Sequence, residues 1–384
     1  MKALVLEADR DPRPEYILSE FERRTGKAVA GSSVWRHPKP QLGEVDQPAP
    51  GPREVLIRVK ACGICGSDIH FYETDADGYM LYPGLTKFPT IIGHEFSGVV
   101  EEVGSEVDDL KAGDMVTSEE MIWCGHCTPC RNGFPNHCVN LEEIGFTIPG
   151  AMAEYITVGA RYCWRIDAIA ERYGDREKAF EAGSLVEPTS VAYNAIFERG
   201  GGFRPGAFVA IYGTGPIGLA AAALSKAAGA SKVIAFELKE SRRRLAELMG
   251  ADFAFDPQED KPSEVVKDLT GGAGADFHIE AAGAPQATLP EMERSLAINA
   301  KVVQIGRATQ RVPLYLETFQ VRRAQLFGSQ GHSGHSIFPS VIRMMASGLI
   351  DMTKIITARF ALDDAIEALE RATHREDGKI TVRI

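Results

Sequence analysis

Two cysteines, a serine, an aspartate and a histidine lie within nine residues of sequence, from Cys62 to His70. A cysteine thiolate is a strong zinc ligand, a histidine can bind metal or carry protons, and a nearby carboxylate can orient a ligand. Paired cysteines in a Gly-rich loop are also often structural. A functional interpretation of this stretch therefore depends on four later groups of residues. They are Gly93-His94-Glu95, the cysteines from Cys124 to Cys138, Glu187-Pro188, and the glycines from Gly213 to Gly218.

The later cysteines form a compact cluster with two, two and seven residues between them. They are Cys124, Cys127, Cys130 and Cys138. Four thiolates around tetrahedral zinc leave no position for a substrate, so this spacing predicts a structural zinc site. An iron–sulfur cluster and a redox switch are the alternatives. Zinc is favoured because the segment is short, loop-like and rich in Gly and Pro, so it needs a cross-link to hold its structure.

A Gly-rich turn lies between an apolar strand, predicted over 208–212, and a helix of small residues. Its glycines allow the tight turn and the close approach of a pyrophosphate, and the helix N-terminus favours phosphate charge. The next strand, predicted over 232–236, is followed by Glu237, which would accept hydrogen bonds from both ribose hydroxyls and repel a 2′-phosphate. This order predicts NAD rather than NADP. The predicted cofactor-binding residues are Gly213, Gly215, Pro216, Ile217, Gly218, Glu237, Arg242 and Gly283.

The elements that must position these motifs are of two kinds. Up to residue 184, short apolar runs alternate with Pro and Gly, which is typical of β-strands joined by turns, and a polar stretch between Arg10 and Trp35 has the character of an insertion. Beyond it, strands and helices alternate as in a doubly wound parallel sheet. We predict an α/β protein with a β-rich domain followed, from about residue 185, by a doubly wound parallel-sheet domain.

Composition narrows the class of partner. The chain has 384 residues, enough for two domains, and a net charge of −11, which argues against nucleic acid or an anionic membrane as partner. The N-terminal apolar run is too short for a signal peptide, and the most apolar stretch, 217–230, is too short to span a bilayer. Seven cysteines, an odd number, favour metal ligation in a reducing cytosol over disulfides. We therefore expect a cytoplasmic protein that acts on a small molecule.

Together these motifs resemble the zinc-dependent medium-chain alcohol and polyol dehydrogenases over essentially the whole chain. The resemblance implies a GroES-like β-rich catalytic domain over 1–184 and 337–384, a Rossmann domain over 185–336, and a cleft that holds zinc and nicotinamide. It also implies that Cys65 and His94 bind a catalytic zinc, and that the adjacent Glu95 can enter or leave the coordination sphere. The implied proton relay and supporting carboxylate are Ser67, His70 and Asp68.

One departure from the alcohol-dehydrogenase branch bears on the substrate. That branch uses a third cysteine ligand, but no cysteine follows Cys163 in this chain. The implied counterpart is Glu187, as in the sorbitol and threonine dehydrogenase branches, and either Glu95 or Glu187 could be the resting third ligand. A zinc held by one thiolate, one imidazole and carboxylates or water suits a polyol that chelates through neighbouring hydroxyls.

Within the polyol branch, residues 183–194, 320–325 and 328–335 most resemble enzymes that oxidise inososes in an inositol-degrading route. This resemblance makes scyllo-inosose the leading candidate substrate, with Asp75, Asp77, Tyr79 and Tyr82 as candidate hydroxyl-binding groups. The alternatives are a sorbitol- or threonine-type enzyme, an aminocyclitol dehydrogenase, a zinc-free quinone or enoyl reductase, and a noncatalytic NAD-binding redox sensor. The loop histidines His332 and His335 either contact substrate or only turn the chain. We also expect a homo-oligomer, a dimer or tetramer.

Overall fold

The computed structural model describes residues 1–308 and 310–384, which form two compact units. The first unit comprises Met1–Glu187, Ala358–His374 and Ile380–Ile384, and the second comprises Pro188–Thr357 and Arg375–Lys379. This division differs from the expected one chiefly at 337–357, which groups with the second unit. The reason is local packing, because the 3₁₀ turn η5 (Met352–Ile355) lies against helices α7 (Pro216–Ala227) and α8 (Glu240–Leu248).

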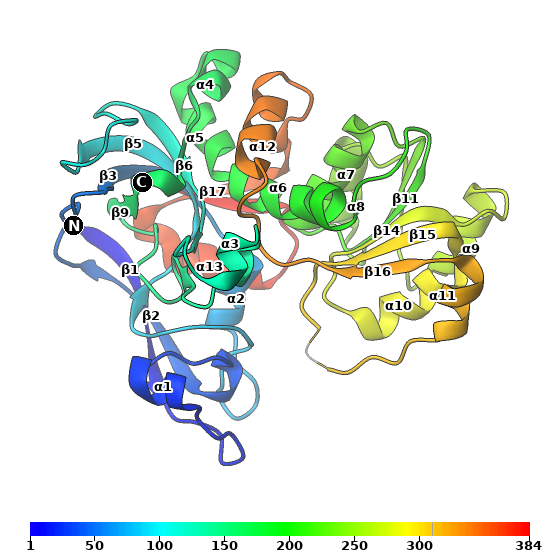
Figure 1. The fold of residues 1–384 in the computed structure, drawn as a ribbon, viewed down its shortest axis with the longest axis horizontal. Coiled ribbons are helices and arrows are strands. Elements are labelled where there is room, and N and C mark those ends of the chain that lie inside the picture. Colours follow the sequence, from blue (N-terminus) through cyan, green and yellow to red (C-terminus); the bar gives the residue numbers. More distant parts are fainter. Residues whose placement is uncertain (309) are drawn as a thin grey trace. The chain divides into compact units, whose positions relative to one another are not determined.

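The first unit is built mainly from β-strands, as the Pro- and Gly-punctuated sequence predicts (Figure 1). Its large sheet has the order β10 (Cys163–Arg165), β6 (Met115–Ser118), β5 (Glu95–Val103), β3 (Glu54–Gly63), β18 (Lys379–Arg383) and β17 (Ile356–Ala361), and β9 (Tyr155–Gly159) also pairs with β3. The C-terminal strand returns to this unit, since Val382 lies opposite Cys62 in an antiparallel pair. A smaller sheet has the order β2 (Trp35–Glu44), β1 (Lys2–Arg10) and β4 (Thr90–Ile91).

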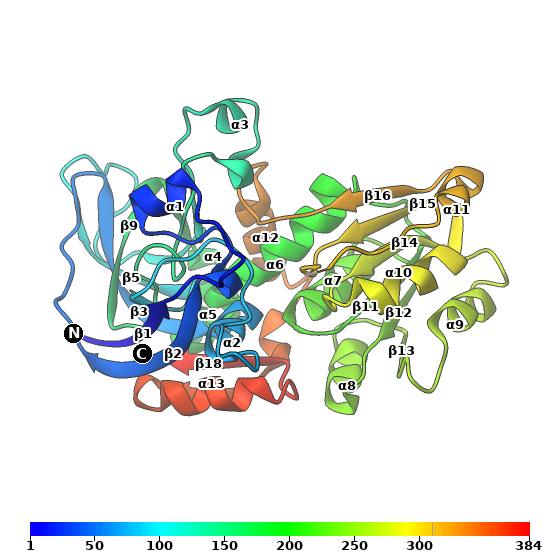
Figure 2. The ribbon, with the colours of Figure 1, turned by 90° about the horizontal axis from the view of Figure 1, so that it is seen from below.

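The second unit is a parallel sheet with helices in its connections, and it confirms the predicted doubly wound domain (Figure 2). The strand order is β13 (Phe253–Phe255), β12 (Lys232–Phe236), β11 (Phe208–Tyr212), β14 (Ala275–Glu280), β15 (Leu296–Gln304) and β16 (Gln325–Gly328). The connecting helices include α9 (Pro262–Leu269), α10 (Pro285–Arg294) and α11 (Leu316–Arg322). Strand order reverses between β11 and β14, and such sheets bind dinucleotides at the carboxyl ends of the strands on either side of this point.

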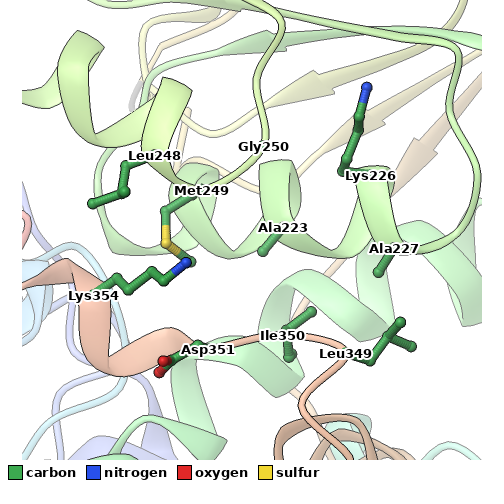
Figure 3. Close-up of a pocket in the computed structure, with 10 residues that line it drawn as sticks. All are labelled: Ala223, Lys226, Ala227, Leu248, Met249, Gly250, Leu349, Ile350, Asp351 and Lys354. Carbon is green, nitrogen blue, oxygen red and sulfur yellow. The ribbon is translucent and has the colours of Figure 1, made fainter.

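A hollow in the second unit lies beside α7, the end of α8 and the chain that enters η5 (Figure 3). The residues that line it are Ala223, Lys226, Ala227, Leu248, Met249, Gly250, Leu349, Ile350, Asp351 and Lys354. These residues are distinct from the predicted catalytic, metal-binding and cofactor-binding residues.

None of the helices formed by residues 1–308 and 310–384 has both the length and the apolar character needed to cross a membrane.

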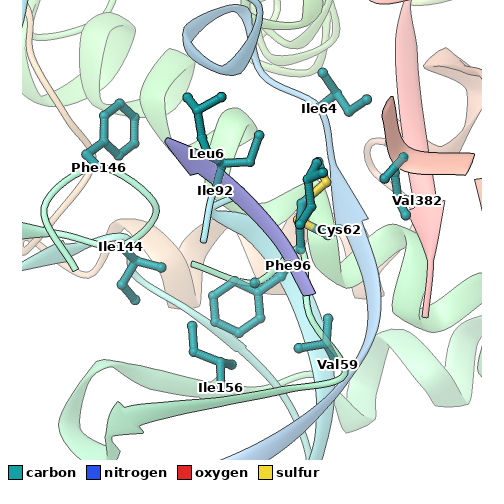
Figure 4. Close-up of a cluster of buried hydrophobic side chains, with 14 of the residues drawn as sticks. Leu6, Val59, Cys62, Ile64, Ile92, Phe96, Ile144, Phe146, Ile156 and Val382 are labelled. Atoms are coloured by element: carbon teal, nitrogen blue, oxygen red, sulfur yellow. The ribbon is translucent and has the colours of Figure 1, made fainter. Parts of the chain in front are cut away.

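The core of the first unit fixes the loop that carries the predicted catalytic residues. Cys62, at the end of β3, is fully buried among side chains from β1, β5 and β18, including Leu6, Phe96 and Val382 (Figure 4). Burying an aliphatic or aromatic side chain such as Leu6, Phe96 or Val382 stabilises the fold by roughly 1.5–3 kcal/mol. The end of β3 is therefore held rigidly, and the chain leaves it to form the loop and helix α2 (Gly66–Tyr72).

Candidate active site

The loop after β3 is closed by an aspartate at the start of α2. Asp68 is fully buried, and one of its carboxylate oxygens accepts a hydrogen bond from the Cys65 backbone N–H at 2.9 Å. Its other carboxylate oxygen lies 3.9 Å from Nδ1 of His94. The side chain thus faces both Cys65 and His94, as expected of a carboxylate that orients metal ligands.

Cys65, His94 and Glu95 come together at this point. Each offers one ligand atom, and the three atoms lie within 4.8 Å of one another. The turn before them requires glycine, because Gly93 has φ +88° and a Cβ there would lie 2.8 Å from Sγ of Cys62. His94 and Glu95 are buried at the start of β5. A thiolate, an imidazole and a carboxylate at these separations can hold a zinc ion with bonds of about 2.0–2.3 Å.

Negative charge is concentrated around His94. Burial by itself would lower the pKa of His94, but Asp68, Cys65 and Glu187 raise this pKa well above its usual value. Glu187 lies in the first turn of α6 (Val186–Tyr193) and is buried. The structure therefore brings Glu187 to the electrostatic environment of His94, although almost a hundred residues separate them in sequence. Buried anionic groups this close together need a compensating positive charge, so the cluster is suited to binding a dication.

A second buried glutamate of this unit, Glu120, was not among the residues predicted from the sequence. A carboxylate oxygen of Glu120 lies within 4.8 Å of one from Glu187, and both side chains are less than 10 % exposed. Glu120 follows β6, immediately before the cysteine cluster. A glutamate pair directly after an apolar strand was the available signal, since buried carboxylates are rare unless they have partners.

Ser67 and His70 lie three residues apart on α2, so they share one side of the helix. The Ser67 hydroxyl oxygen is buried and has no hydrogen-bond partner among residues 1–308 and 310–384. His70 is partly exposed, and its backbone carbonyl accepts hydrogen bonds from the amides of Leu81 and Tyr82. This arrangement leaves the serine oxygen available to a ligand and holds His70 at the rim of the loop.

The polar residues predicted to bind substrate hydroxyls make contacts with arginine and aromatic side chains of the first unit. Asp75 is paired with Arg13 and accepts hydrogen bonds from two backbone amides of its own turn. The ring of Tyr79 lies 3.9 Å from the guanidinium of Arg13 and 4.9 Å from that of Arg36, while Asp77 lies 3.7 Å from Arg13. Tyr82 packs against Phe71 with ring centroids 4.9 Å apart. These contacts favour a structural role for the segment.

The four clustered cysteines have the geometry of a closed zinc site. Their sulfurs lie within 4.8 Å of one another, and the Cys127 and Cys138 sulfurs are 3.8 Å apart. Sulfurs placed tetrahedrally at 2.3 Å from one ion are about 3.8 Å apart. Backbone N–H donors, chiefly that of His126, lower the pKa of Cys124 to about 5, so this thiol ionises readily.

The predicted cofactor residues gather at the carboxyl ends of β11, β12 and β14. Gly213 has φ +86°, and a Cβ there would lie 2.6 Å from Cα of Ala282, so only glycine fits. Gly215 caps α7, Pro216 occupies its first turn, and Ile217 and Gly218 follow in the helix. The Glu237 carboxylate accepts a hydrogen bond from the Thr214 backbone N–H at 2.8 Å.

Two further cofactor candidates lie at the same edge. Arg242 is largely desolvated, which lowers its pKa, and its Nη1 would lie 3.9 Å from a Cβ placed on Gly215. The backbone N–H of Gly283 donates to the Glu280 carboxylate at 3.3 Å. The glycine loop that begins at Gly213 leads directly into the N-terminus of α7, an arrangement that fits a dinucleotide pyrophosphate.

Comparisons with known proteins agree with these features. Residues 51–168 match the alcohol dehydrogenase GroES-like domain, and residues 216–347 match the zinc-binding dehydrogenase domain. The chain is 52% identical over 383 residues to scyllo-inosose 3-dehydrogenase of Thermotoga maritima, covering 97% of this chain and 96% of that protein. It is 35% identical to L-threonine 3-dehydrogenase of Bacillus subtilis, covering 88% of this chain and 93% of that protein.

Solved structures give the same result. A structure described as an alcohol dehydrogenase from Thermotoga maritima matches with a TM-score of 0.96 and 50% identity, covering 100% of both chains. A zinc-binding dehydrogenase of Sinorhizobium meliloti bound to NADP matches with a TM-score of 0.79 and 29% identity, covering 93% of this chain and 99% of that chain. An Escherichia coli alcohol dehydrogenase with NADH matches with a TM-score of 0.81 and 26% identity, covering 100% and 99%. The chain therefore belongs to the zinc-binding alcohol dehydrogenase family, as its motifs predicted.

Proposed function

We propose that this dehydrogenase oxidises a secondary hydroxyl of a cyclic polyol or inosose, with NAD as acceptor and scyllo-inosose as the leading substrate. The observation that carries the proposal is the buried convergence of Cys65, His94 and Glu95, with Glu187 in the same electrostatic environment. The full-length relationship to scyllo-inosose 3-dehydrogenase supports the substrate class. Sorbitol-, threonine- and aminocyclitol-type substrates are the alternatives.

The catalytic zinc would be held by Cys65, His94 and one of the two glutamates, Glu95 or Glu187. When bound, zinc supplies Lewis-acid polarisation of the reacting hydroxyl and lowers its pKa. Asp68 holds the Cys65 loop and orients His94. Ser67 would accept the proton of the reacting hydroxyl while passing its own proton on toward His70, and His70 would release a proton to solvent, because both residues lie along one side of α2.

NAD is the proposed cofactor because Glu237 ends the second strand of the nucleotide domain. Its carboxylate would accept from the adenosine ribose hydroxyls and repel a 2′-phosphate. The solved neighbours contain NADP in one case and NADH in another, so the proposal depends on Glu237 in this chain. Arg242 and the glycines of the loop would face the pyrophosphate.

The cysteine cluster would hold a second, structural zinc that stabilises a loop-rich lobe. We further propose a cytoplasmic homo-oligomer, a dimer or tetramer, without nucleic-acid or membrane partners. The strand β16 lies at the edge of its sheet, and Leu326 on it and Leu316 on α11 are exposed. A sheet edge with exposed apolar side chains is a surface that favours association.

Two measurements test this function. The purified protein should contain two zinc ions per chain and should reduce NAD with at least one inosose or inositol in a panel that also includes sorbitol, L-threonine and primary alcohols. Zinc-free protein would favour the zinc-independent reductase branch, and NAD binding without turnover on any substrate would favour a redox sensor. Higher kcat/KM for L-threonine or a primary alcohol than for every cyclitol would exclude the cyclitol assignment.

A further inference from the structure

The carboxyl edge of the nucleotide-binding sheet has two sides. Glu237 lies at the end of β12, and a ribose-binding acidic residue marks the adenosine half of a dinucleotide. The strand order reverses at β11, so β14, β15 and β16 lie on the other side of the switch point. The turns that follow these three strands are therefore on the side that receives the nicotinamide half.

A buried carboxylate joins two of these turns. The Glu280 side chain, at the end of β14, accepts hydrogen bonds from the backbone N–H groups of Gly283 at 3.3 Å and Ala284 at 3.2 Å and from the Thr288 hydroxyl at 3.3 Å. It also accepts a hydrogen bond from Nε2 of Gln304, at the end of β15, at 2.7 Å. The Glu280 side chain is fully buried. A carboxylate can accept all four bonds because both of its oxygens act only as acceptors.

The same contacts extend to the turn after β16. The Gln304 side chain donates to the Gly306 carbonyl at 2.7 Å, and the Gln304 carbonyl accepts from the Ser329 backbone N–H at 2.9 Å. Nδ2 of Asn194 donates to the Gly331 carbonyl at 2.8 Å and so fixes the far part of that turn. One hydrogen-bond network thus links the turns after β14, β15 and β16.

The network also bears on the phosphate loop. The turn that Glu280 holds contains Ala282, the residue against which Gly213 packs without room for a Cβ. The turns after β14 and β15 touch each other equally closely, since a Cβ on Gly306 would lie 2.3 Å from the Gly283 nitrogen. A shift of the 281–284 turn would therefore move the backbone on the nicotinamide side, whereas Glu237 is held separately through Thr214.

We propose that Glu280 is a positioning residue for the nicotinamide half of the cofactor. It holds the turns after β14 and β15 at one spacing, and through Gln304 it holds the start of the turn after β16. The inference rests on the proposed use of NAD. A Glu280→Gln side chain has the same shape but replaces one acceptor oxygen with an NH₂ group, which would face a donor and open the network.

The experiment uses calorimetry on protein free of NAD and compares the binding of two ligands: NAD, and ADP-ribose, which lacks nicotinamide. Glu280→Gln is expected to weaken NAD binding about tenfold and ADP-ribose binding by a smaller factor, because ADP-ribose senses the turn only through the contact of Ala282 with Gly213. The matched control is Glu291→Gln, a largely buried glutamate on α10 that accepts a hydrogen bond from the Ser263 backbone N–H; it should bind both ligands as the wild type does. In turnover, Glu280→Gln should raise the KM for NAD and lower kcat.

A second variant, Gln304→Met, removes the shortest of the four hydrogen bonds from the opposite side and should give the same NAD-selective loss even if Glu280→Gln folds poorly. Unchanged NAD binding in both variants would overturn the inference. Equal weakening of NAD and ADP-ribose would also overturn it, because Glu280 would then support the whole domain rather than the nicotinamide side. A wild-type protein that binds neither ligand would refute the proposed cofactor itself.

Discussion

Replacement of Glu181 by alanine should destabilise the first unit because this carboxylate joins a helix to two C-terminal strands. Glu181 lies on α5 (Arg176–Ser184), its side chain is 4% exposed, and it pairs with Arg359 and Arg383. The four N–O distances are 2.7 and 2.9 Å to Arg359 and 2.9 and 2.6 Å to Arg383. Because α5 leads directly to α6, this contact also fixes the chain that carries Glu187.

The magnitude follows from the exposure of the partners. Removing one member of a fully buried ion pair costs about 3–5 kcal/mol, largely because the remaining charge is left without a partner. Here the arginine side chains are 40% and 48% exposed, so water can hydrate them, and the expected loss is about 2–3 kcal/mol. For a unit of this size that corresponds to a decrease in Tm of about 5–10 °C.

The assay is thermal unfolding of the holoenzyme followed by circular dichroism, with Glu177→Ala as the control. Glu177 lies one turn earlier on α5, is 79% exposed and is 3.7 Å from Arg383, so its removal should cost less than about 0.5 kcal/mol. Burial opposes ionisation of Glu181, but the two arginines prevail and lower its pKa. The stabilisation is therefore present above the unfolded-state pKa of roughly 4.3 and is lost as the pH falls through the folded-state pKa. Equal Tm values for the two variants at pH 7 would refute the reasoning.

Four other predictions concern metal, cofactor and pH. Cys127→Ser should remove one zinc per chain and lower Tm, whereas Cys163→Ser, at a partly buried thiol outside the cluster, should retain both ions. Metal analysis that finds no difference between the two variants would contradict the structural zinc site. Asp68→Asn should lower affinity for the catalytic zinc by about 10–100-fold, measured by competition with a chelator, because the carboxylate that faces His94 is lost. Glu237→Ala should reduce the preference for NAD over NADP, and a wild-type enzyme equally active with both would count against the assigned role. Burial lowers the pKa of His278 to about 4 from an unfolded value of 6.5. As the pH falls from 7 to 4 the unfolded chain therefore binds a proton before the folded chain does, and the free energy of unfolding should fall by about 3 kcal/mol. His278→Leu should remove this part of the pH-dependent loss of stability, measured by urea unfolding.

Sequence patterns indicated those parts of the candidate site whose residues lie close together in the chain. The cysteines from Cys124 to Cys138, Gly93-His94-Glu95 and the glycine loop each occupy a short stretch of sequence, whereas the grouping of Cys65, His94 and Glu187 was implied by the family resemblance. The doubly wound sheet followed from the alternation of strand and helix. Residues in contact across long sequence separations were missed, as for Glu120 beside Glu187 and for Glu280 beside Gln304. Their partners are chosen by tertiary packing, which leaves no periodic trace in the sequence.

The polar residues of segment 73–88 have protein partners that the sequence did not predict. The aspartates and tyrosines of this segment were interpreted as hydroxyl-binding groups because such side chains suit a polyol, but Arg13 of the inserted stretch and Arg36 of β2 enclose Tyr79. The type of a residue indicates what it could bind, and the fold decides which partner reaches it first. The same interactions explain why a polar insertion is ordered, since Tyr79 and Asp75 give it a cation–π contact and an ion pair with Arg13.

Charge at the proposed zinc site would distinguish among the substrates of the relatives. Glu120 and Glu187 would add two buried carboxyl groups to those of Asp68 and Glu95 and to the Cys65 ligand, so a single dication would leave the site negative. A neutral cyclitol can donate hydroxyl hydrogen bonds to such carboxylates, whereas the carboxylate of L-threonine would be repelled by them. A site built to bond hydroxyl groups also rejects analogues that lack them, because its buried acceptors are then left without partners. On this argument Glu120→Gln should improve kcat/KM for L-threonine relative to an inosose, and an unchanged or lower ratio would show that its charge plays no part in substrate choice.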